Sequence, residues 1–230
     1  MGIVNVNYHI LHKLYLGRAA APPSSAATRQ SILKYRLART EARCYDHIIG
    51  KLYLQEEIIV SFNTEHLQWT RQPGSCSITQ SKIEIITTPR TDLWQRTYYH
   101  FRNDNAPVLQ MSTEERFFSF VVKTEFESRH RFDQCGVVVY LDSENWLKAS
   151  VEYENEEIQH LGSVVTNHGY SDWATTAIGA DIKSMWYRLS RREADYCLEC
   201  SSDGVRFSQM RVCHLWEGGG EIRFGIYACS

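Results

Sequence analysis

The feature that most constrains the fold of this chain is a period-two alternation of apolar and polar residues, which begins near Ile58 and continues to the C-terminus. In the run from 118 to 126, every second residue is apolar or threonine, whereas Lys123 and Glu125 lie between them. Because successive side chains of a β-strand point to opposite faces, this pattern predicts strands with one buried and one solvated face. We therefore expect residues 57–230 to form one all-β domain.

Turn signals separate the alternating runs. Asp203-Gly204 lies between two of them, and Gly218-Gly219-Gly220 precedes the last one. Such residues tolerate the positive φ angles that tight hairpin turns require. Since the sequence contains no repeat of the length that defines propellers or solenoids, we expect two antiparallel sheets packed as a jelly-roll sandwich.

The N-terminal segment has a different composition. Residues 1–40 contain six basic residues and no Asp or Glu, and a Pro-Pro pair at 22 and 23 precedes a helix-like run from Ser25 to Thr40. An acid-free start with arginine and serine is similar to a mitochondrial transit peptide. We expect residues 1–50 to form a basic N-terminal extension, partly disordered or helical.

The charge balance and the cysteines indicate location and partners. The whole chain has a net charge of −2, so the part beyond residue 40 is acidic and would repel a phosphate backbone. We expect no nucleic-acid partner, and no membrane partner, because no apolar stretch approaches the ~20 residues that cross a bilayer. Seven scattered cysteines without a secretory signal favour reduced thiols and a cytoplasmic location, with a mitochondrial one as the alternative.

Motifs of the common enzyme and cofactor classes are missing from the sequence. It contains no GxSxG, GxGxxG, P-loop or HExxH motif, and its histidines occur singly. Cys197 and Cys200 have CxxC spacing, but a zinc ribbon needs a second such pair. We therefore predict no cofactor and no metal site.

The segment from Thr91 to Phe101 is the most informative for function. Read as one strand, it places a mixture of polar and aromatic residues on a single face, namely Asp92, Trp94, Arg96, Tyr98 and His100. Further strands and a loop add more residues of the same kind, namely Gln134, Tyr140, Trp146, Lys148, Glu152, Asp172 and Trp173. Such a surface can stack on a sugar ring or another planar ligand and form hydrogen bonds with its edge. The alternative is that these aromatic residues cap sheet edges and that Arg–Asp pairs connect strands.

Carboxylates in the segment from Glu152 to Glu156 raise the possibility of catalysis. Alternate residues of a strand lie about 7 Å apart, and retaining glycosidases need two carboxyl groups about 5 to 5.5 Å apart. Glu152 and Glu154 are therefore weak catalytic candidates. An acidic exposed turn is the simpler explanation, so we favour a protein without catalytic residues.

Five segments, in order, resemble one known family. They are TDLWQRTYYHFRNDN, RFDQCGVVVYLDSENWLKASVEYENE, LGSVVTNHGYSDW, YRLSRREADYCLECSSDGVRFSQMRVCHL and RFGIYACS. They are similar to the family that includes the fungal "regulation of enolase" proteins and bacterial relatives of unknown function. The resemblance spans about 58–230 and implies a concanavalin A-like lectin/glucanase fold, but no established activity.

Three functions are compatible with these observations. The first is a non-catalytic module that binds a carbohydrate or another small ligand. The second is a regulator of metabolism that acts by binding a protein partner, which the resemblance implies. The third is a glycoside hydrolase that uses carboxylates near Glu152.

Overall fold

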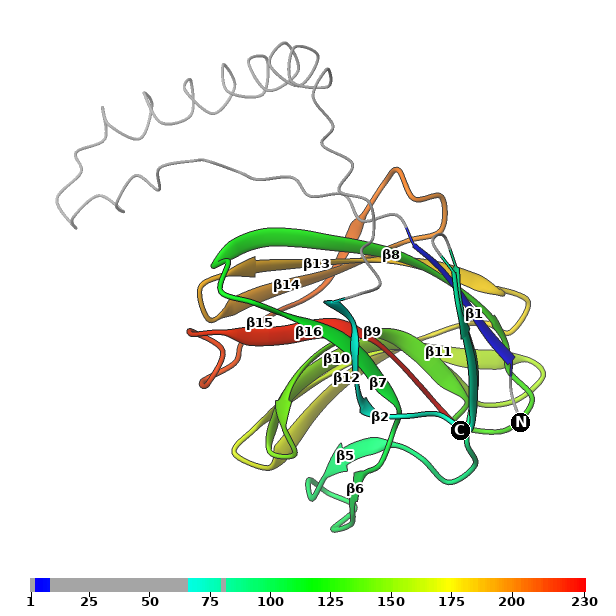
Figure 1. The fold of residues 1–230 in the computed structure, drawn as a ribbon. Coiled ribbons are helices and arrows are strands. Elements are labelled where there is room, and N and C mark those ends of the chain that lie inside the picture. The colour runs from blue at the N-terminus through cyan, green and yellow to red at the C-terminus, as the bar shows by residue number, and fades with distance from the viewer. Residues whose placement is uncertain (1–2, 9–65, 80–81) are drawn as a thin grey trace, which may run out of the picture.

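The computed structural model describes residues 3–8, 66–79 and 82–230 (Figure 1). These residues form two seven-stranded antiparallel sheets and one small hairpin. The first sheet has the order β15(Ser208–His214), β14(Asp195–Ser201), β13(Ser184–Arg192), β8(Phe117–Glu127), β1(Ile3–Tyr8), β4(Lys82–Ile86) and β3(Ser75–Ile78). The second has the order β12(Tyr170–Gly179), β11(Ile158–Asn167), β10(Asn145–Tyr153), β9(Gln134–Asp142), β16(Ile222–Cys229), β7(Val108–Thr113) and β2(Gln68–Arg71). The hairpin consists of β5(Leu93–Gln95) and β6(Arg102–Asp104).

The two large sheets pack face to face, as the alternating pattern predicts. In β8, Phe118, Phe120 and Val122 are buried, whereas Lys123 and Glu125 between the later apolar positions are only partly buried. The apolar side of β8 meets alternate residues of the second sheet, so that a single core forms between the sheets. The prediction of an all-β, two-sheet antiparallel sandwich is confirmed.

A second apolar cluster covers the opposite side of the second sheet, which we call the outer face. Leu93 and Trp94 of β5 pack there against side chains of β9, β10, β11 and β16. The backbone N–H of Gln95 donates to Ser171 Oγ at 2.9 Å, which ties β5 to the start of β12. The hairpin, labelled β5 and β6 in Figure 1, therefore turns part of the outer face into a second, smaller core.

The N-terminal strand corrects the predicted domain boundary. Ile3–Tyr8 pairs with both β4 and β8, so this segment belongs to the first sheet and not to an extension. Its sequence, in which Asn5 and Asn7 separate apolar residues, already has the alternation of a strand. The basic composition of the surrounding segment obscured that signal. The helix predicted from Ser25 to Thr40 lies outside the described residues.

The segment from Thr91 to Phe101 is not one strand, which corrects a second prediction. Only Leu93–Gln95 is extended, and a tight turn follows in which Arg96, Tyr98 and His100 have φ angles of 55°, 61° and 61°. This turn reverses the chain between the antiparallel strands β5 and β6, so alternate residues beyond Gln95 no longer share a face. Within the described part of the chain, no helix is both long and apolar enough to cross a membrane.

Candidate functional site

A buried lysine lies at the centre of the outer face. Lys148 Nζ donates to Asp92 Oδ1 and to Gln134 Oε1, both at 3.0 Å. Gln134 Oε1 also accepts a hydrogen bond of 2.8 Å from the Tyr227 hydroxyl. The rings of Trp146 and Tyr227 flank the ammonium group, with centroids 5.8 and 5.3 Å from Nζ. Three residues predicted from the sequence, Asp92, Gln134 and Lys148, thus meet in one network.

Lys148 remains charged in this environment. Burial lowers its pKa, but the nearby carboxylate of Asp92 and its hydrogen bond, with a contribution from Glu152, raise the pKa above its ordinary value. The side chain of Lys148 is 4% exposed, whereas that of Asp92 is 27% exposed. Asp92 therefore connects the buried charge to the surface of the protein.

Glu152 lies farther along β10 on the same face. In the register it is opposite Gln134 of β9 and His160 of β11. The pKa of Glu152 is raised to about 7, mainly by burial. The nearby carboxylates of Asp92 and Glu154 also raise it, whereas the charges of Lys148 and Arg131 lower it. Among the described residues, no hydrogen bond or salt bridge engages its half-buried carboxyl group. Glu152 can therefore accept or donate a proton near neutral pH.

The second candidate carboxylate is held by a cation. Arg131 Nη2 lies 2.9 Å from Glu154 Oε1, and Arg131 Nε donates to Oε2 at 3.1 Å. His160 Nε2 is 4.0 Å from the same Oε2 atom, while His160 Nδ1 is buried without a partner among the described residues. The paired carboxylate suits a structural or orienting role better than the role of a free nucleophile.

A row of aromatic rings extends from His160 across the outer face. The ring centroids of His160 and Trp173 are 6.3 Å apart, those of Trp173 and Trp94 are 6.3 Å apart, and those of Trp94 and Tyr99 are 5.6 Å apart. A Cβ atom on Gly162 would lie 2.9 Å from Trp173 Nε1, so glycine lets the indole lie close against β11. We call the row Tyr99, Trp94, Trp173, His160 and Glu152 the outer-face band.

The residues of the band differ in how much surface they present. Trp173 is 37% exposed and Tyr99 is 53% exposed, whereas Trp94 is 8% exposed. Trp94 Nε1 is buried and has no partner among the described residues. Trp173 and Tyr99 therefore expose ring surface to solvent, and the buried ring of Trp94 contacts both of them.

Two predicted site residues lie on the expected face but are buried. Trp146 is fully buried in the second apolar cluster, and Tyr140 is 4% exposed, with its hydroxyl bound to Asp104. The expectation that these rings are exposed is wrong, because the β5–β6 hairpin covers them. Their shared face with Lys148 and Glu152 is nonetheless confirmed by the register of β9 and β10.

Four other predicted residues do not join the band. Arg96 pairs with Glu144 at 2.9 Å, and Asp172 pairs with Arg211 of the first sheet at 2.9 Å. Tyr98 is 83% exposed at the tip of the turn, and His100 is also exposed there. The turn with positive φ angles separates Arg96, Tyr98 and His100, and alternation places Asp172 on the side of β12 opposite Trp173.

His160 belongs to the band but was not among the predicted residues. The signal that identifies it is the pairing of β10 with β11, which places His160 directly opposite Glu152. From the sequence, this pairing could be obtained only by fixing the turn between Tyr153 and Ile158. A one-residue error in that turn would move His160 to the other face.

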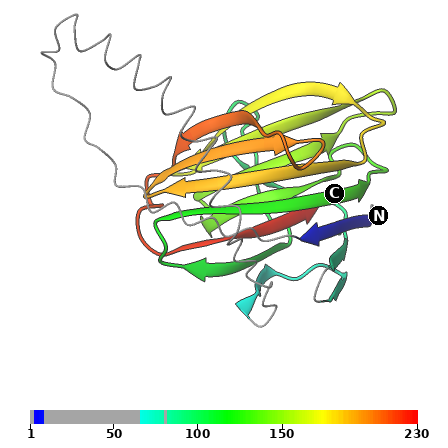
Figure 2. The same cartoon turned by 90° about the horizontal axis from the view of Figure 1, so that it is seen from above.

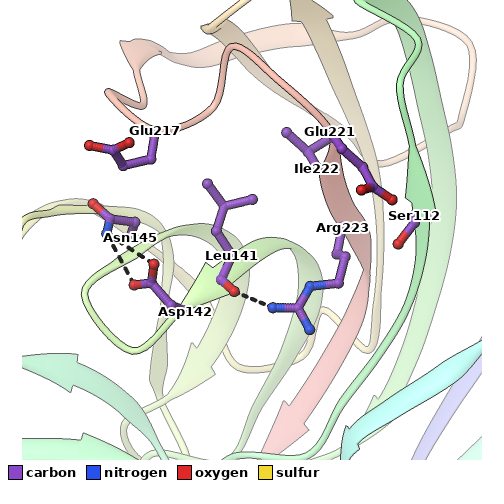
Figure 3. Close-up of a pocket in the computed structure, with 8 residues that line it drawn as sticks. All are labelled: Ser112, Leu141, Asp142, Asn145, Glu217, Glu221, Ile222 and Arg223. Carbon is purple, nitrogen blue, oxygen red and sulfur yellow. Dashed lines mark hydrogen bonds between the residues drawn. The ribbon is translucent and has the colours of Figure 1, made fainter.

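A separate hollow of about 440 Å³ lies elsewhere on the protein (Figure 3). Its lining consists of Ser112, Leu141, Asp142, Asn145, Glu217, Glu221, Ile222 and Arg223. Arg223 donates to the Leu141 carbonyl, and the Asn145 amide donates to Asp142, so several of its polar groups bind one another. None of the predicted site residues lines this hollow, and it is not part of the outer-face band.

Metal and thiol chemistry would depend on how the cysteines and possible metal ligands of the described residues are arranged. The described residues contain no group of three or more His, Cys, Asp or Glu side chains arranged to hold a metal ion. Cys197 and Cys200 both lie in β14 as free thiols, and burial raises the pKa of each, which disfavours the reactive thiolate. The segment with CxxC spacing is therefore part of strand β14.

The fold and the outer-face band define an antiparallel β-sandwich protein with aromatic and carboxylate groups on the outer side of one sheet. The chain belongs to the family described as protein of unknown function DUF1349, whose model matches residues 69–230. This confirms the family membership that the five sequence segments predicted.

Known relatives agree with this assignment. The chain is 34% identical over 158 residues to Regulation of enolase protein 1 of Saccharomyces cerevisiae, covering 67% of this chain and 78% of the relative. A crystal structure of a functionally unknown protein from Saccharomyces cerevisiae matches with a TM-score of 0.67 and 28% identity, over 72% of this chain and 88% of that chain.

A more distant match concerns the fold alone. The GH43 protein BlXynB from Bacillus licheniformis matches with a TM-score of 0.55 and 16% identity, over 74% of this chain but 34% of that chain. At this identity the likeness shows a shared β-sandwich and carries no activity from one protein to the other. The narrower assignment to the concanavalin A-like type stays a prediction.

Proposed function

We propose that this protein is a non-catalytic module that binds a neutral, polyhydroxylated ligand, such as a carbohydrate, along the outer-face band. The observation that carries the proposal is the continuity of the band from the exposed ring of Trp173 to His160 and the unpaired carboxyl group of Glu152. Aromatic ring faces bind the apolar C–H surface of a sugar, while carboxylate and imidazole groups form hydrogen bonds with its hydroxyls.

The charges around the band support a neutral ligand. Lys148 is paired with Asp92, Arg131 with Glu154, and Arg96 with Glu144. Because these cations are neutralised by their own partners, a phosphate or sulfate group would meet the carboxyl group of Glu152 without a matching positive charge. A hydroxyl group can accept or donate a hydrogen bond there in either protonation state of Glu152.

Trp173→Ala tests the proposal directly. We expect the wild-type protein to give signals on an array of neutral glycans, and the variant to bind the same glycans about tenfold or more weakly, because one lost stacking contact removes about 1.4 kcal/mol or more. The dissociation constants can be measured by isothermal titration calorimetry with the glycan that gives the strongest array signal.

Trp216→Ala is the matched control. Trp216 is 68% exposed and its ring contacts His214 of β15 in the first sheet, not a ring of the band, so its removal should leave glycan binding unchanged. Wild-type protein without any neutral-glycan signal would refute the proposal, as would a Trp173→Ala variant that binds as tightly as the wild type.

A second candidate function, glycoside hydrolysis, is favoured by one observation. Glu152 has the raised pKa of about 7 that a general acid uses near neutral pH. A retaining mechanism also needs a second, free carboxylate, and the nearest predicted candidate, Glu154, is paired with Arg131. This pairing is the reason we place hydrolysis second. Release of a chromogenic leaving group that disappears in Glu152→Gln would reverse that order.

The pH dependence of stability tests the environment of Glu152. Its pKa in the folded protein, about 7, lies above the ordinary 4.5, so the folded state binds more protons than the unfolded state between these values. The stabilising contribution of Glu152 is therefore fully present below about pH 4.5 and is lost as the pH rises through 7. Glu152→Gln lacks this loss. We expect the variant to gain about 1 to 3 kcal/mol relative to the wild type between pH 5 and pH 8, as measured by urea denaturation.

Glu156→Gln provides the control for that titration, because it makes the same chemical change at an exposed carboxylate in the following turn. Its stability difference from the wild type should be the same at both pH values. Parallel pH curves for the wild type and Glu152→Gln would show that burial does not perturb this carboxyl group.

We extend the proposal to partners and location. A carbohydrate or other small ligand is the expected partner, with no nucleic acid and no membrane, and the cytoplasm is the proposed location, with the mitochondrion as the alternative. The role of a regulator that binds a protein draws on the name of the yeast relative and on exposed Tyr98 and Tyr99, and it stays a prediction.

A further inference from the structure

The edge strand β12 has the features of a pairing surface. It ends the second sheet, and Figure 2 shows it in yellow along one rim of the sandwich. Its ten residues pair with β11 in a continuous register, and residues 172–177 are exposed. An exposed, regular edge strand presents a row of unpaired N–H and C=O groups to another chain.

The other three sheet edges of the described fold are protected in ways that β12 is not. β2 and β3 are four residues long, and the register of β2 shifts between Trp69 and Arg71. β15 pairs with β14 through a register shift between Leu198 and Glu199. Short strands and bulges are common means of preventing edge pairing. Strand β12 contains no lysine, arginine or proline, and its only charged side chain, Asp172, binds Arg211 of β15.

The hairpin turn determines which backbone groups of β12 point outward. His168 and Gly169 have φ angles of 51° and 74° and form a two-residue turn closed by the pair Asn167 and Tyr170. The closing pair of such a turn is hydrogen-bonded, and hydrogen-bonded pairs alternate with non-hydrogen-bonded pairs along the ladder. By this alternation the backbone groups directed away from β11 belong to every second residue from Ser171 to Gly179. Ser171 is buried, and the Gly179 carbonyl already accepts hydrogen bonds from Ile182 and Gln159. The groups that another chain can reach are therefore those of Trp173, Thr175 and Ala177.

We propose that two copies of this chain associate through antiparallel pairing of β12 with β12, around a two-fold axis at Thr175. This register pairs the accessible outward backbone groups of Trp173, Thr175 and Ala177 of each copy. It places the large side chain of Trp173 beside the small side chain of Ala177 of the second copy, and it brings no two like charges into opposition.

Such pairing joins the two second sheets and brings the two outer faces together along one side of the dimer. Trp173 of each copy then lies at the junction, so each outer-face band borders the second copy. Two binding faces in one particle increase the apparent affinity for a ligand that carries repeated units. The pairing itself stands on the edge geometry and does not depend on the ligand that the band binds.

Sedimentation velocity of the full chain and of Thr175 variants tests the proposal. The wild type should sediment as a dimer at micromolar concentration. Thr175→Lys and Thr175→Glu should each be monomeric, with dimerisation weakened about tenfold or more, because the axis places two like charges side by side. An equimolar mixture of the two variants should restore the dimer, because lysine then lies opposite glutamate.

The control is Gln209→Lys, which adds the same charge to the exposed edge strand β15 and should leave the dimer intact. A monomeric wild type would overturn the proposal, as would a dimer that persists in Thr175→Lys. Failure of the mixture to dimerise would overturn the axis at Thr175. Unchanged thermal unfolding of the monomer variants would exclude misfolding as the cause of dissociation.

Discussion

Asp92→Ala should lower the free energy of unfolding by about 3 to 5 kcal/mol, because it removes one partner of a buried charge pair and leaves the other uncompensated. The charge left behind is Lys148, whose side chain is 4% exposed and whose ammonium group binds Asp92 Oδ1 at 3.0 Å. Urea denaturation of the wild type and the variant at neutral pH measures the effect.

A substitution of the other partner, Lys148, should lower the free energy of unfolding much less. Lys148→Met removes the charge and fills the site with an apolar side chain of similar length, while Asp92, which is 27% exposed, keeps its contact with water and the N–H of Leu93. We expect a loss of about 1 to 2 kcal/mol. The double variant should be more stable than Asp92→Ala alone, because no buried charge remains.

Asp172→Ala is the matched control for this series. Asp172 also pairs with a basic side chain, but its own side chain is 76% exposed, and such pairs contribute about 0 to 1 kcal/mol. Equal losses for Asp92→Ala and Asp172→Ala would mean that Lys148 reaches water when its partner is removed. The network would then be an ordinary surface ion pair.

The sandwich and part of the site could be predicted from the sequence because both follow from alternation along strands. Alternation alone places Trp146, Lys148 and Glu152 on one face of β10, and the register with β9 adds Gln134 opposite Glu152. Each of these statements depends on neighbouring residues within a strand or across one strand pair. Short-range patterns of this kind are the most reliable part of a sequence analysis.

The errors arose where the chain leaves that pattern. Arg96, Tyr98 and His100 adopt positive φ angles. Such angles can be anticipated from the sequence at Gly and Asn but rarely at other residue types. A tight turn therefore looked like the continuation of a strand. Strain of this kind is more frequent near functional sites. This turn carries Tyr99, which is part of the outer-face band and contacts Trp94.

The sequence also did not indicate that a hairpin from an earlier part of the chain buries part of the outer face. Whether the outer face of β10 is solvated depends on where β5 and β6 pack, about fifty residues earlier in the chain. The same alternation pattern fits an exposed binding surface and a second small core. The structure contains a small core and an exposed surface side by side, with Trp146 in the core and Trp173 on the surface.

Trp146→Ala provides the sharpest test of that distinction. Its side chain is fully buried, and its indole Nε1 donates to the Ser143 carbonyl at 3.3 Å. Truncation of a buried tryptophan should lower the free energy of unfolding by about 3 to 5 kcal/mol, because a large cavity replaces its contacts. Denaturant unfolding of purified protein measures this loss.

Trp173→Ala is the natural comparison, since the same substitution on the exposed part of the outer face should change stability by less than about 1 kcal/mol. Trp146→Phe should recover part of the loss in Trp146→Ala, because it refills most of the cavity without the N–H donor. Equal stability losses at 146 and 173 would contradict the division of the outer face into core and surface. A Trp146→Ala variant that kept wild-type stability but lost glycan binding would mean that the β5–β6 hairpin opens, and that the ligand reaches the indole beneath it.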